Sequence, residues 1–381
     1  MSETQNAVAT HGKIPALDGL RGLAILMVMV SHFIFLSWPN TAWYRVLQSG
    51  WLGVDLFFVL SGFLITGILV GTRERADYFR RFYKRRALRI FPLYFFAILV
   101  VWLCVVLVER APERLHGWDS WGWYVFFSSN IAMAFKGDWT WHSNFLDANH
   151  LWSIAVEEQF YILWPLVVWL LPNRILLIVC ALLVHFSTPI RYFTDAQFGQ
   201  NFSMASYMLP YCRMDGLAAG AFLAVFFRLN WHEQFRQLAQ KHTRIPDLDK
   251  WLVRGLLLWM SVRLFDGLAH GHTQYMGTLS ALVFAAILYL ALNPHPTALV
   301  RRFCEIPFLQ HMGKYSYGLY VFHHLQHAIW HKYIETPLVS TGMNLFVAQI
   351  IYIGIAFGLT YAMARLSWRY IEEPFLRLKT G

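Results

Sequence analysis

The sequence predicts an all-α protein, a polytopic membrane helix bundle of about ten transmembrane helices. Hydrophobic residues make up 57% of the 381 residues and charged residues only 14%, whereas soluble domains carry about 25% charged residues. Apolar runs of about 20 residues, the length with which a helix spans a bilayer, recur along the whole chain. These runs lack the strict alternation of barrel strands, so helices are expected.

Ten apolar runs are expected to span the membrane. They cover residues 22–38, 51–70, 90–108, 151–171, 175–190, 205–227, 251–268, 275–292, 315–335 and 343–364. The first is expected to stay as an uncleaved span, because no small-residue cleavage site follows it. The basic residues cluster in short loops, so the net charge of +10 indicates membrane topology rather than nucleic-acid binding. With ten spans these loops and both termini are cytoplasmic, and residues 1–381 form a single integral-membrane domain.

Two interpretations stay open for the tryptophan-rich stretch 118–136. It is either an eleventh span or a re-entrant part of one external excursion over residues 109–149. An eleventh span would place several basic clusters outside, against the positive-inside rule, so the excursion is favoured.

The first span carries two candidate functional residues on one face. Arg21 and His32 are eleven residues apart, which is 20° past three full helical turns and a rise of about 16 Å. Arg21 alone is typical of a snorkelling anchor, and His32 alone of an interhelical hydrogen bond. An imidazole near the bilayer midplane can also take and return a proton, so His32 is a candidate general base.

A carboxylate in the second span needs a partner. Asp55 lies one turn inside that span, and Gly62 on the same face would let a neighbouring backbone approach closely. The imidazole of His32 is the partner we expect, which would orient it as a base. A buried structural ion pair is the alternative.

A polar stripe runs down the span that starts near residue 151. His150, Ser153, Glu157 and Tyr161 follow at spacings of three, four and four residues. Glu157, rather than Glu158, is therefore expected to face the bundle interior at a depth of about 10 Å. Glu157 is a candidate catalytic residue, and Tyr161 and Trp152 are assigned to the substrate path.

The span 315–335 carries polar side chains along one side, which predicts an interior path. These side chains are Tyr317, Tyr320, His324, His327 and His331. His323 points to another side of this helix, but with Tyr320 and His324 it is assigned to the substrate path. A histidine metal site is the alternative, and it lacks carboxylate partners. The four cysteines are scattered singly, so no metal site is expected.

Arginines gather where the third span begins. Arg86 and Arg89 are three residues apart on one helix face, with Arg85 beside them. With Arg21 they would lie at the inner interface, where planar guanidinium groups suit phosphate binding. A topological anchor is the alternative. In the sixth span Arg213 and Asp215 are expected to pair with each other.

Taken together, these motifs resemble the acyltransferase 3 family of multi-spanning membrane O-acyltransferases over nearly the whole chain. The matching stretches are IPALDGLRGLAILMVMVSHF, GVDLFFVLSGFLIT, RRALRIFPLYF, HLWSIAVEEQFYILWPL, RMDGLAAGAFLA, YSYGLYVFHH and RYIEEPF. The family's arginine and histidine pattern falls on Arg21 and His32, its paired arginines on Arg86 and Arg89, and its glutamate on Glu157. Many members add an external hydrolase-like domain, so the resemblance implies a stand-alone form here. Members often have a proline after the histidine where Leu325 and Gln326 follow.

The resemblance implies transfer of an acyl group, usually acetyl, from cytoplasmic acyl-CoA to a hydroxyl group. The acceptor is a sugar of an envelope or exported glycan, or a small molecule, and the enzyme lies in the bacterial cytoplasmic (inner) membrane. Arg21, Arg86 and Arg89 would hold the phosphates of acetyl-CoA, with no metal. His32 would act as general base, oriented by Asp55 or by Glu157.

Several alternatives stay open. An acyl-histidine intermediate is one. A proton-coupled transporter or flippase also uses buried His, Asp and Glu side chains, although the sequence shows none of the inverted repeats typical of such proteins. A catalytically silent partner subunit is a third possibility. The oligomeric state stays open.

Overall fold

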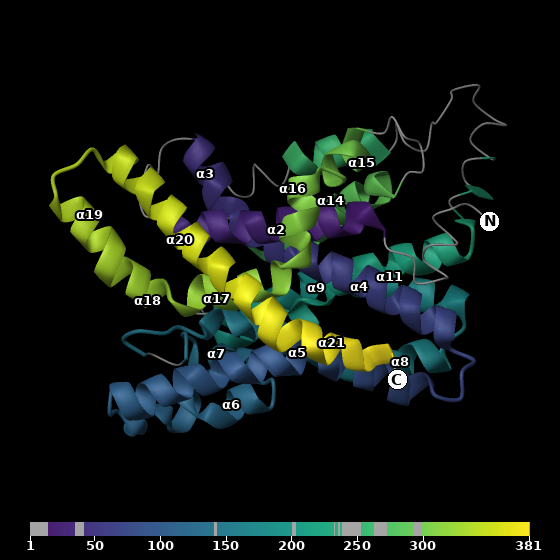
Figure 1. Ribbon diagram of the computed structural model, residues 1–381. Coiled ribbons are helices and arrows are strands. Elements are labelled where there is room, and N and C mark those ends of the chain that lie inside the picture. Colours follow the sequence, from purple (N-terminus) through teal and green to yellow (C-terminus); the bar gives the residue numbers. More distant parts are fainter. Residues whose placement is uncertain are drawn as a thin grey trace. The chain divides into compact units, whose positions relative to one another are not determined.

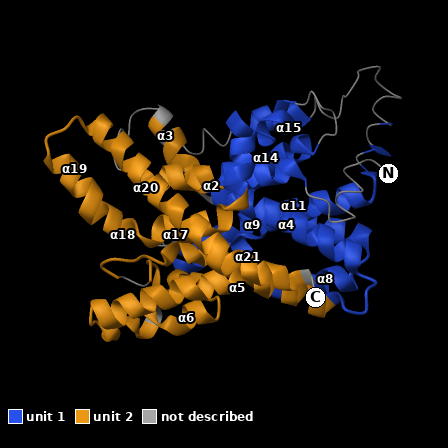
Figure 2. Cartoon of the chain, viewed as in Figure 1, with its two compact units in different colours: residues 1–24, 52–78, 160–313 blue, residues 25–51, 79–159, 314–381 orange. Residues whose placement is uncertain are grey.

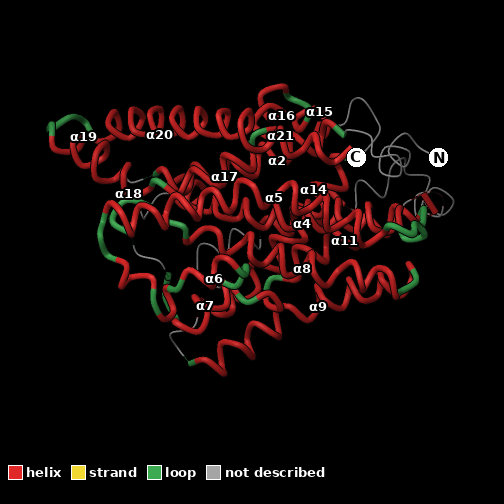
Figure 3. The backbone as a smooth tube through the Cα atoms, turned by 60° about the horizontal axis from the view of Figure 1, so that its bottom comes forward, coloured by secondary structure: helices red, strands yellow, loops and turns green. Residues whose placement is uncertain are grey.

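The structure is a computed structural model in which the described residues form helices and no strands (Figures 1 and 3). The described residues are 14–34, 42–140, 143–199, 203–231, 233–234, 237, 253–262, 273–292 and 299–380. The prediction of an all-α, polytopic membrane protein is confirmed.

Six helices in the described part are long and apolar enough to cross a membrane. They coincide with six expected spans, and most run past the expected ends. They are α2 (Pro15–Phe33), Val46–Thr72 with α4 (Gly53–Thr72), Tyr78–Val108 with α5 (Tyr78–Leu103), Asn149–Leu170 with α8 (Trp152–Leu170), α9 (Asn173–Phe198), and Leu345–Arg377 with α20 (Leu345–Ser367). Residues 35–38 of the first expected span lie outside the described residues.

The other four expected spans correspond to shorter or interrupted helices. Residues 205–227 are divided at Pro210 into α10 (Ser203–Met208) and α11 (Met214–Arg228). The span 275–292 is α14 (Thr273–Ala291), and of 251–268 the structure describes Val253–Val262. The span 315–335 consists of α17 (Ser316–Leu325), α18 (His327–Trp330) and the π-helical turn η7 (His331–Glu335). Shorter helices are α3 (Ala42–Gln48), α15 (Leu299–Cys304), α16 (Pro307–Lys314), α19 (Thr336–Ser340) and α21 (Glu373–Arg377).

The chain divides into two compact units, each built from three segments of sequence (Figure 2). Unit 1 contains residues 1–24, 52–78 and 160–313, and unit 2 contains residues 25–51, 79–159 and 314–381. Both α2 and α8 contribute residues to each unit, so the units are not consecutive domains. The single-domain assignment stays a prediction.

Glycines allow two helices of unit 1 to pack backbone against backbone. A Cβ atom added to Gly62 of α4 would lie 1.9 Å from the carbonyl oxygen of Leu217 in α11. One added to Gly220 of α11 would lie 1.9 Å from the carbonyl oxygen of Val59. Small residues at such positions let membrane helices approach closely, as the sequence predicted for Gly62.

We expect Gly62→Ala to destabilise the α4–α11 contact by about 1–3 kcal/mol, the usual cost of overpacking, because the facing atoms are backbone and cannot rotate away. The measurement is the thermal unfolding midpoint in detergent. Gly71→Ala in the same helix is the matched control, since nothing lies within 4 Å of a Cβ atom added there. Equal midpoints for the two variants would contradict the prediction.

The helices α6 (Trp121–Val125) and α7 (Ser129–Lys136) form a hairpin in unit 2. The Tyr94 hydroxyl of α5 donates to the carbonyl of Tyr124 at 2.8 Å. The Gln159 amide of α8 donates to the carbonyl of Phe127 at 2.8 Å. These side chains satisfy carbonyls at the tip of the hairpin, as a bilayer interior requires.

The depth of these contacts bears on the two interpretations of stretch 118–136. Gln159 lies ten residues from Asn149, where the apolar helix begins, so the tip reaches about 15 Å along α8. Helices of 5 and 8 residues are too short to cross a core of about 30 Å. Both observations favour one excursion over an eleventh span.

Candidate active site

Four histidine rings of unit 2 pack together, and we call His32, His150, His323 and His324 the histidine cluster. The His32 ring centroid lies 5.0 Å from that of His323 and 4.8 Å from that of His324. His150, in the 3₁₀ turn η5 (Asn149–Leu151), lies 5.3 Å from both. The fold thus joins the end of α2, the start of α8 and the end of α17.

The end of α17 is fixed by the last residues of the segment 109–149. The backbone N–H of Asp147 donates to the carbonyl of Leu325 at 2.8 Å. The Asp147 carboxylate lies 3.6 Å from Nδ1 of His324. The ring of His327, at the start of α18, stacks on that of His324 at 5.2 Å. Asp147 is therefore a carboxylate at the cluster, which sequence reasoning missed.

The hydrogen bond of His32 assigns its proton. Nδ1 of His32 lies 2.9 Å from the carbonyl oxygen of Val28, one turn earlier in α2. A carbonyl only accepts, so Nδ1 carries the hydrogen and Nε2 of the neutral ring keeps a lone pair. His32 is half-buried, while His323 is fully buried. His32 thus has the protonation state of a general base.

The prediction that His323 points elsewhere is wrong. It is 0% exposed and contacts His32. The histidine cluster takes residues from two adjacent faces of α17, because the consecutive residues His323 and His324 both belong to it. Tyr320 contacts the histidine cluster and His324 belongs to it, as expected for the polar side of this span. The Tyr320 hydroxyl donates to the carbonyl of His150 at 3.0 Å and lies 2.6 Å from the hydroxyl of Ser153.

The prediction that Glu158 points away from the interior is also wrong. Glu158 is 6% exposed, and Arg86 of α5 lies within electrostatic reach of its carboxylate. Glu157 is half-buried. Trp152 and Tyr161 are both buried, and their place on a substrate path stays a prediction.

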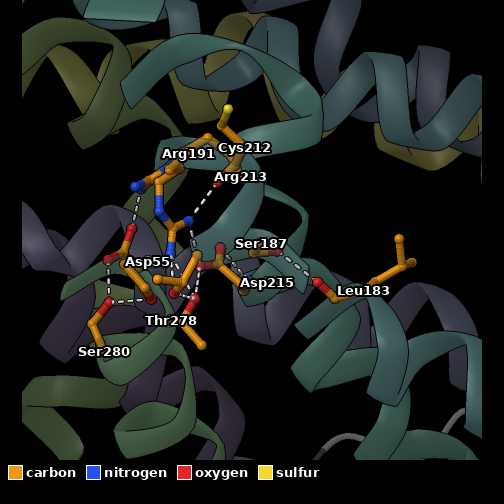
Figure 4. Close-up of polar contacts among 12 residues, drawn as sticks. Asp55, Leu183, Ser187, Arg191, Cys212, Arg213, Asp215, Thr278 and Ser280 are labelled. Atoms are coloured by element: carbon orange, nitrogen blue, oxygen red, sulfur yellow. Dashed lines mark hydrogen bonds and ion pairs between the residues drawn. The ribbon is translucent and has the colours of Figure 1, made fainter. Parts of the chain in front are cut away.

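A second group of charges is buried in unit 1 (Figure 4). Asp55 of α4 pairs with Arg213 at the start of α11 and accepts a hydrogen bond from Ser280 of α14. Asp215 pairs with Arg191 of α9 at 2.8 Å. All four charged side chains are at most 4% exposed.

These pairs correct two predictions. Arg213 does not pair with Asp215, and the partner of Asp55 is an arginine rather than an imidazole. The reason is that four helices meet here, and each buried charge pairs across helices instead of with its neighbour in sequence. Both carboxylate oxygens of Asp55 are engaged, which favours the structural alternative for this residue.

A basic cluster forms at the start of α5 in unit 2. Arg85, Arg86 and Arg89 are half-buried, and Lys379 of the C-terminal 3₁₀ turn η9 (Leu378–Thr380) lies within reach of their charges. Burial and then these three guanidinium groups lower the pKa of Lys379 to about 8. The sequence indicates only that Lys379 belongs to the basic C-terminal tail. Its distance along the chain from α5 gives no sign that the two lie together.

Arg21 is placed in unit 1. It is a half-buried residue of α2 and pairs with Asp18 of the same helix at 3.2 Å. Asp18 lies one helical turn before Arg21 in the sequence. Its contribution to a phosphate site stays a prediction.

An acyltransferase domain family matches residues 14–365. The O-acetyltransferase OatA of Staphylococcus aureus (strain NCTC 8325 / PS 47) is 29% identical over 380 residues, which cover 95% of this chain and 57% of the relative. The putative peptidoglycan O-acetyltransferase YrhL of Bacillus subtilis (strain 168) is 27% identical over 382 residues, 96% of this chain and 55% of the relative.

This chain therefore spans somewhat more than half the length of these relatives. No solved structure gives a significant match. The family match covers most of the chain, and the helices are those of a membrane protein. The chain belongs to the acyltransferase 3 family and is an integral membrane protein.

Proposed function

We propose that the protein transfers an acyl group, most simply acetyl, from acyl-CoA to a hydroxyl of an envelope or exported glycan or of a small molecule. The observation that carries this proposal is the state of His32, whose Nδ1–H is held by Val28 while Nε2 keeps its lone pair. Both relatives are named as O-acetyltransferases, one of them as a putative peptidoglycan enzyme. Because acyl-CoA is cytoplasmic, we place the protein in the bacterial cytoplasmic membrane.

In the proposed reaction His32 moves one proton. Nε2 of His32 takes the hydrogen of the acceptor hydroxyl while its oxygen attacks the thioester carbonyl. The carbon–sulfur bond then breaks, and the same proton passes to the leaving thiolate, which gives an ester and free CoA. No step uses a metal ion.

The imidazolium formed on the way needs a negative charge nearby. Asp147 lies 3.6 Å from His324, whose ring contacts that of His32. Asp55 is already paired with Arg213, so Asp147 is a better candidate for this role than Asp55. Glu157 stays a second candidate.

The basic cluster is the proposed site for the phosphates of acyl-CoA. Arg85, Arg86 and Arg89 offer planar donors that bind phosphate oxygens in pairs, and Lys379 adds a fourth charge. The part of Arg21 in phosphate binding stays a prediction from the sequence. A thioester would then reach His32 from the cytoplasmic side.

We expect binding of adenosine 3′,5′-bisphosphate to weaken by about threefold to tenfold between pH 7 and 9 as Lys379 loses its proton, since an ammonium group contributes to anion binding only while charged. Its pKa of about 8 lies inside this window. The phosphates are nearly fully ionised by pH 7 and do not cause the loss. The measurement is calorimetric titration of purified protein.

Lys379→Arg is the control for this titration, because arginine stays charged throughout the range. Its affinity should stay level from pH 7 to 9, and Lys379→Gln should bind weakly at every pH. A wild-type profile indistinguishable from that of Lys379→Arg would refute the assignment of Lys379.

The second candidate function is a proton-coupled transporter or flippase, favoured by the four clustered imidazoles, since such groups also form proton relays. One experiment separates the two functions. Inside-out vesicles receive acetyl-CoA labelled in the acetyl group, and label is followed into glycan and into small molecules. We expect base-labile label in the acceptor fraction, and none in vesicles without the protein. Uptake of an unmodified solute without any labelled ester would favour the transporter.

A further inference from the structure

Three buried ring nitrogens of the histidine cluster have no hydrogen-bond partner. Nδ1 of His324 faces the Asp147 carboxylate at 3.6 Å. The other two are Nδ1 of His150 and Nε2 of His323, in side chains that are 5% and 0% exposed. The amide oxygen of the adjacent Asn149, 6% exposed, is also without a partner. These two nitrogens and the amide oxygen are acceptors. An unmet acceptor inside a membrane protein costs free energy that a bound donor would recover.

The other nitrogen of each ring is already committed. Nδ1 of His323 lies 2.6 Å from the carbonyl of Tyr320, and Nε2 of His150 lies 3.0 Å from the carbonyl of Val321. A carbonyl only accepts, so these nitrogens carry the hydrogens, and in each neutral ring the other nitrogen carries the lone pair. The backbone of Asp147 is a second hydrogen-bonding neighbour of the His150 ring, so the lone pair of His323 is the better defined of the two. The two rings lie 5.3 Å apart, and that of His323 lies 5.0 Å from that of His32.

This arrangement selects the chemistry of a ligand. It offers lone pairs on adjacent rings, so it fits a molecule with several O–H donors and disfavours carboxylates and phosphates, which only accept. A charged ammonium group would bear the cost of leaving water, which a neutral hydroxyl largely avoids. Among the described residues, no group of three or more His, Cys, Asp or Glu side chains is arranged to hold a metal ion.

We propose that His150 and His323 form a second hydroxyl-binding position beside His32, so that the acceptor is a compound with two neighbouring hydroxyl groups. One hydroxyl gives its proton to Nε2 of His32 and is acylated. The adjacent hydroxyl donates to Nδ1 of His150 or Nε2 of His323 and holds the acceptor in place. This inference rests on the proposed function and specifies its acceptor as a polyol, as in a sugar with adjacent free hydroxyls.

The test compares two acceptors that differ by one hydroxyl, 1,2-cyclohexanediol and cyclohexanol, with acetyl-CoA and the purified full chain in lipid nanodiscs. Release of free thiol gives kcat/KM for each. After correction for the two hydroxyls of the diol, we expect wild-type protein to prefer the diol by about tenfold, the effect of one well-formed hydrogen bond to substrate. Equal values would overturn the inference, as would failure to acylate either compound by protein that labels glycan.

Two variants remove a lone pair and keep the structural hydrogen bond. His150→Gln retains a donor for the carbonyl of Val321, and His323→Asn retains one for the carbonyl of Tyr320. The variant that removes the lone pair to which the second hydroxyl donates should lower the diol preference severalfold toward equality. His150→Asn is the converse control: it keeps an acceptor near the Nδ1 position but loses the bond to Val321, so the preference should survive.

The outcomes separate this inference from the proposed function. If wild-type protein consumes no acetyl-CoA with any acceptor, including glycan, the proposed function fails. If it acylates diol and mono-ol equally in a reaction that needs His32, the function stands and the inference is wrong. A full diol preference in both His150→Gln and His323→Asn would also overturn it.

Discussion

Replacing His32 by alanine is expected to lower the rate of acyl transfer by about 10²- to 10⁴-fold, the contribution typical of a general base. The residue provides the lone pair of Nε2 beside the imidazoles of His323 and His324. Without it the acceptor hydroxyl must attack while still protonated. The measurement is the rate of free thiol release from acetyl-CoA by purified protein with its acceptor.

His32→Asn is the matched variant for this experiment. Its amide can still donate to the carbonyl of Val28, so the end of α2 keeps its hydrogen bond while the lone pair of Nε2 is lost. Both variants should show this loss of rate, and His32→Asn should unfold at the wild-type temperature. Transfer at the wild-type rate by folded His32→Asn would show that another group is the base.

Replacing Arg213 by methionine is expected to lower the free energy of unfolding by about 3–5 kcal/mol, because Asp55 would be left as a buried and uncompensated charge. Thermal unfolding in detergent measures the loss. The exposed pair of Arg377 and Glu373 in α21 provides the control, since its side chains are 77% and 42% exposed. Arg377→Met should change stability by less than about 1 kcal/mol.

The double variant Asp55→Asn/Arg213→Gln tests what this pair does. Both charges are removed, so most of the lost stability should return, since no unpaired ion remains. If the pair is structural, as its burial and the bond from Ser280 indicate, the folded double variant should transfer acyl groups. A stable but inactive double variant would instead restore Asp55 as a catalytic residue.

The sequence determined the fold class and most of the long helices. Hydrophobicity is a property of consecutive residues, and the bilayer sets the length of each span independently of what packs beside it. The same local information identified His32, His324 and the arginines of α5 as candidates, because ionisable side chains in or beside apolar spans are rare. It left open whether residues 118–136 cross the membrane. The hydrogen bonds from Tyr94 and Gln159 to carbonyls of this segment favour an excursion, and they come from other helices.

The tertiary structure decided which groups meet. Helical periodicity places a residue on a face of its own helix but not against a particular neighbour, and the errors follow from this. Asp55 and Arg213 pair across two helices. Glu158 is buried within electrostatic reach of Arg86 from α5. His323 and its neighbour His324 both contact His32. Asp147 and Lys379 had no local signal, because contacts between distant segments brought them to the sites. The sequence therefore determined which segments enter the membrane and which residues can carry charge or protons there, whereas helix packing alone fixed their partners.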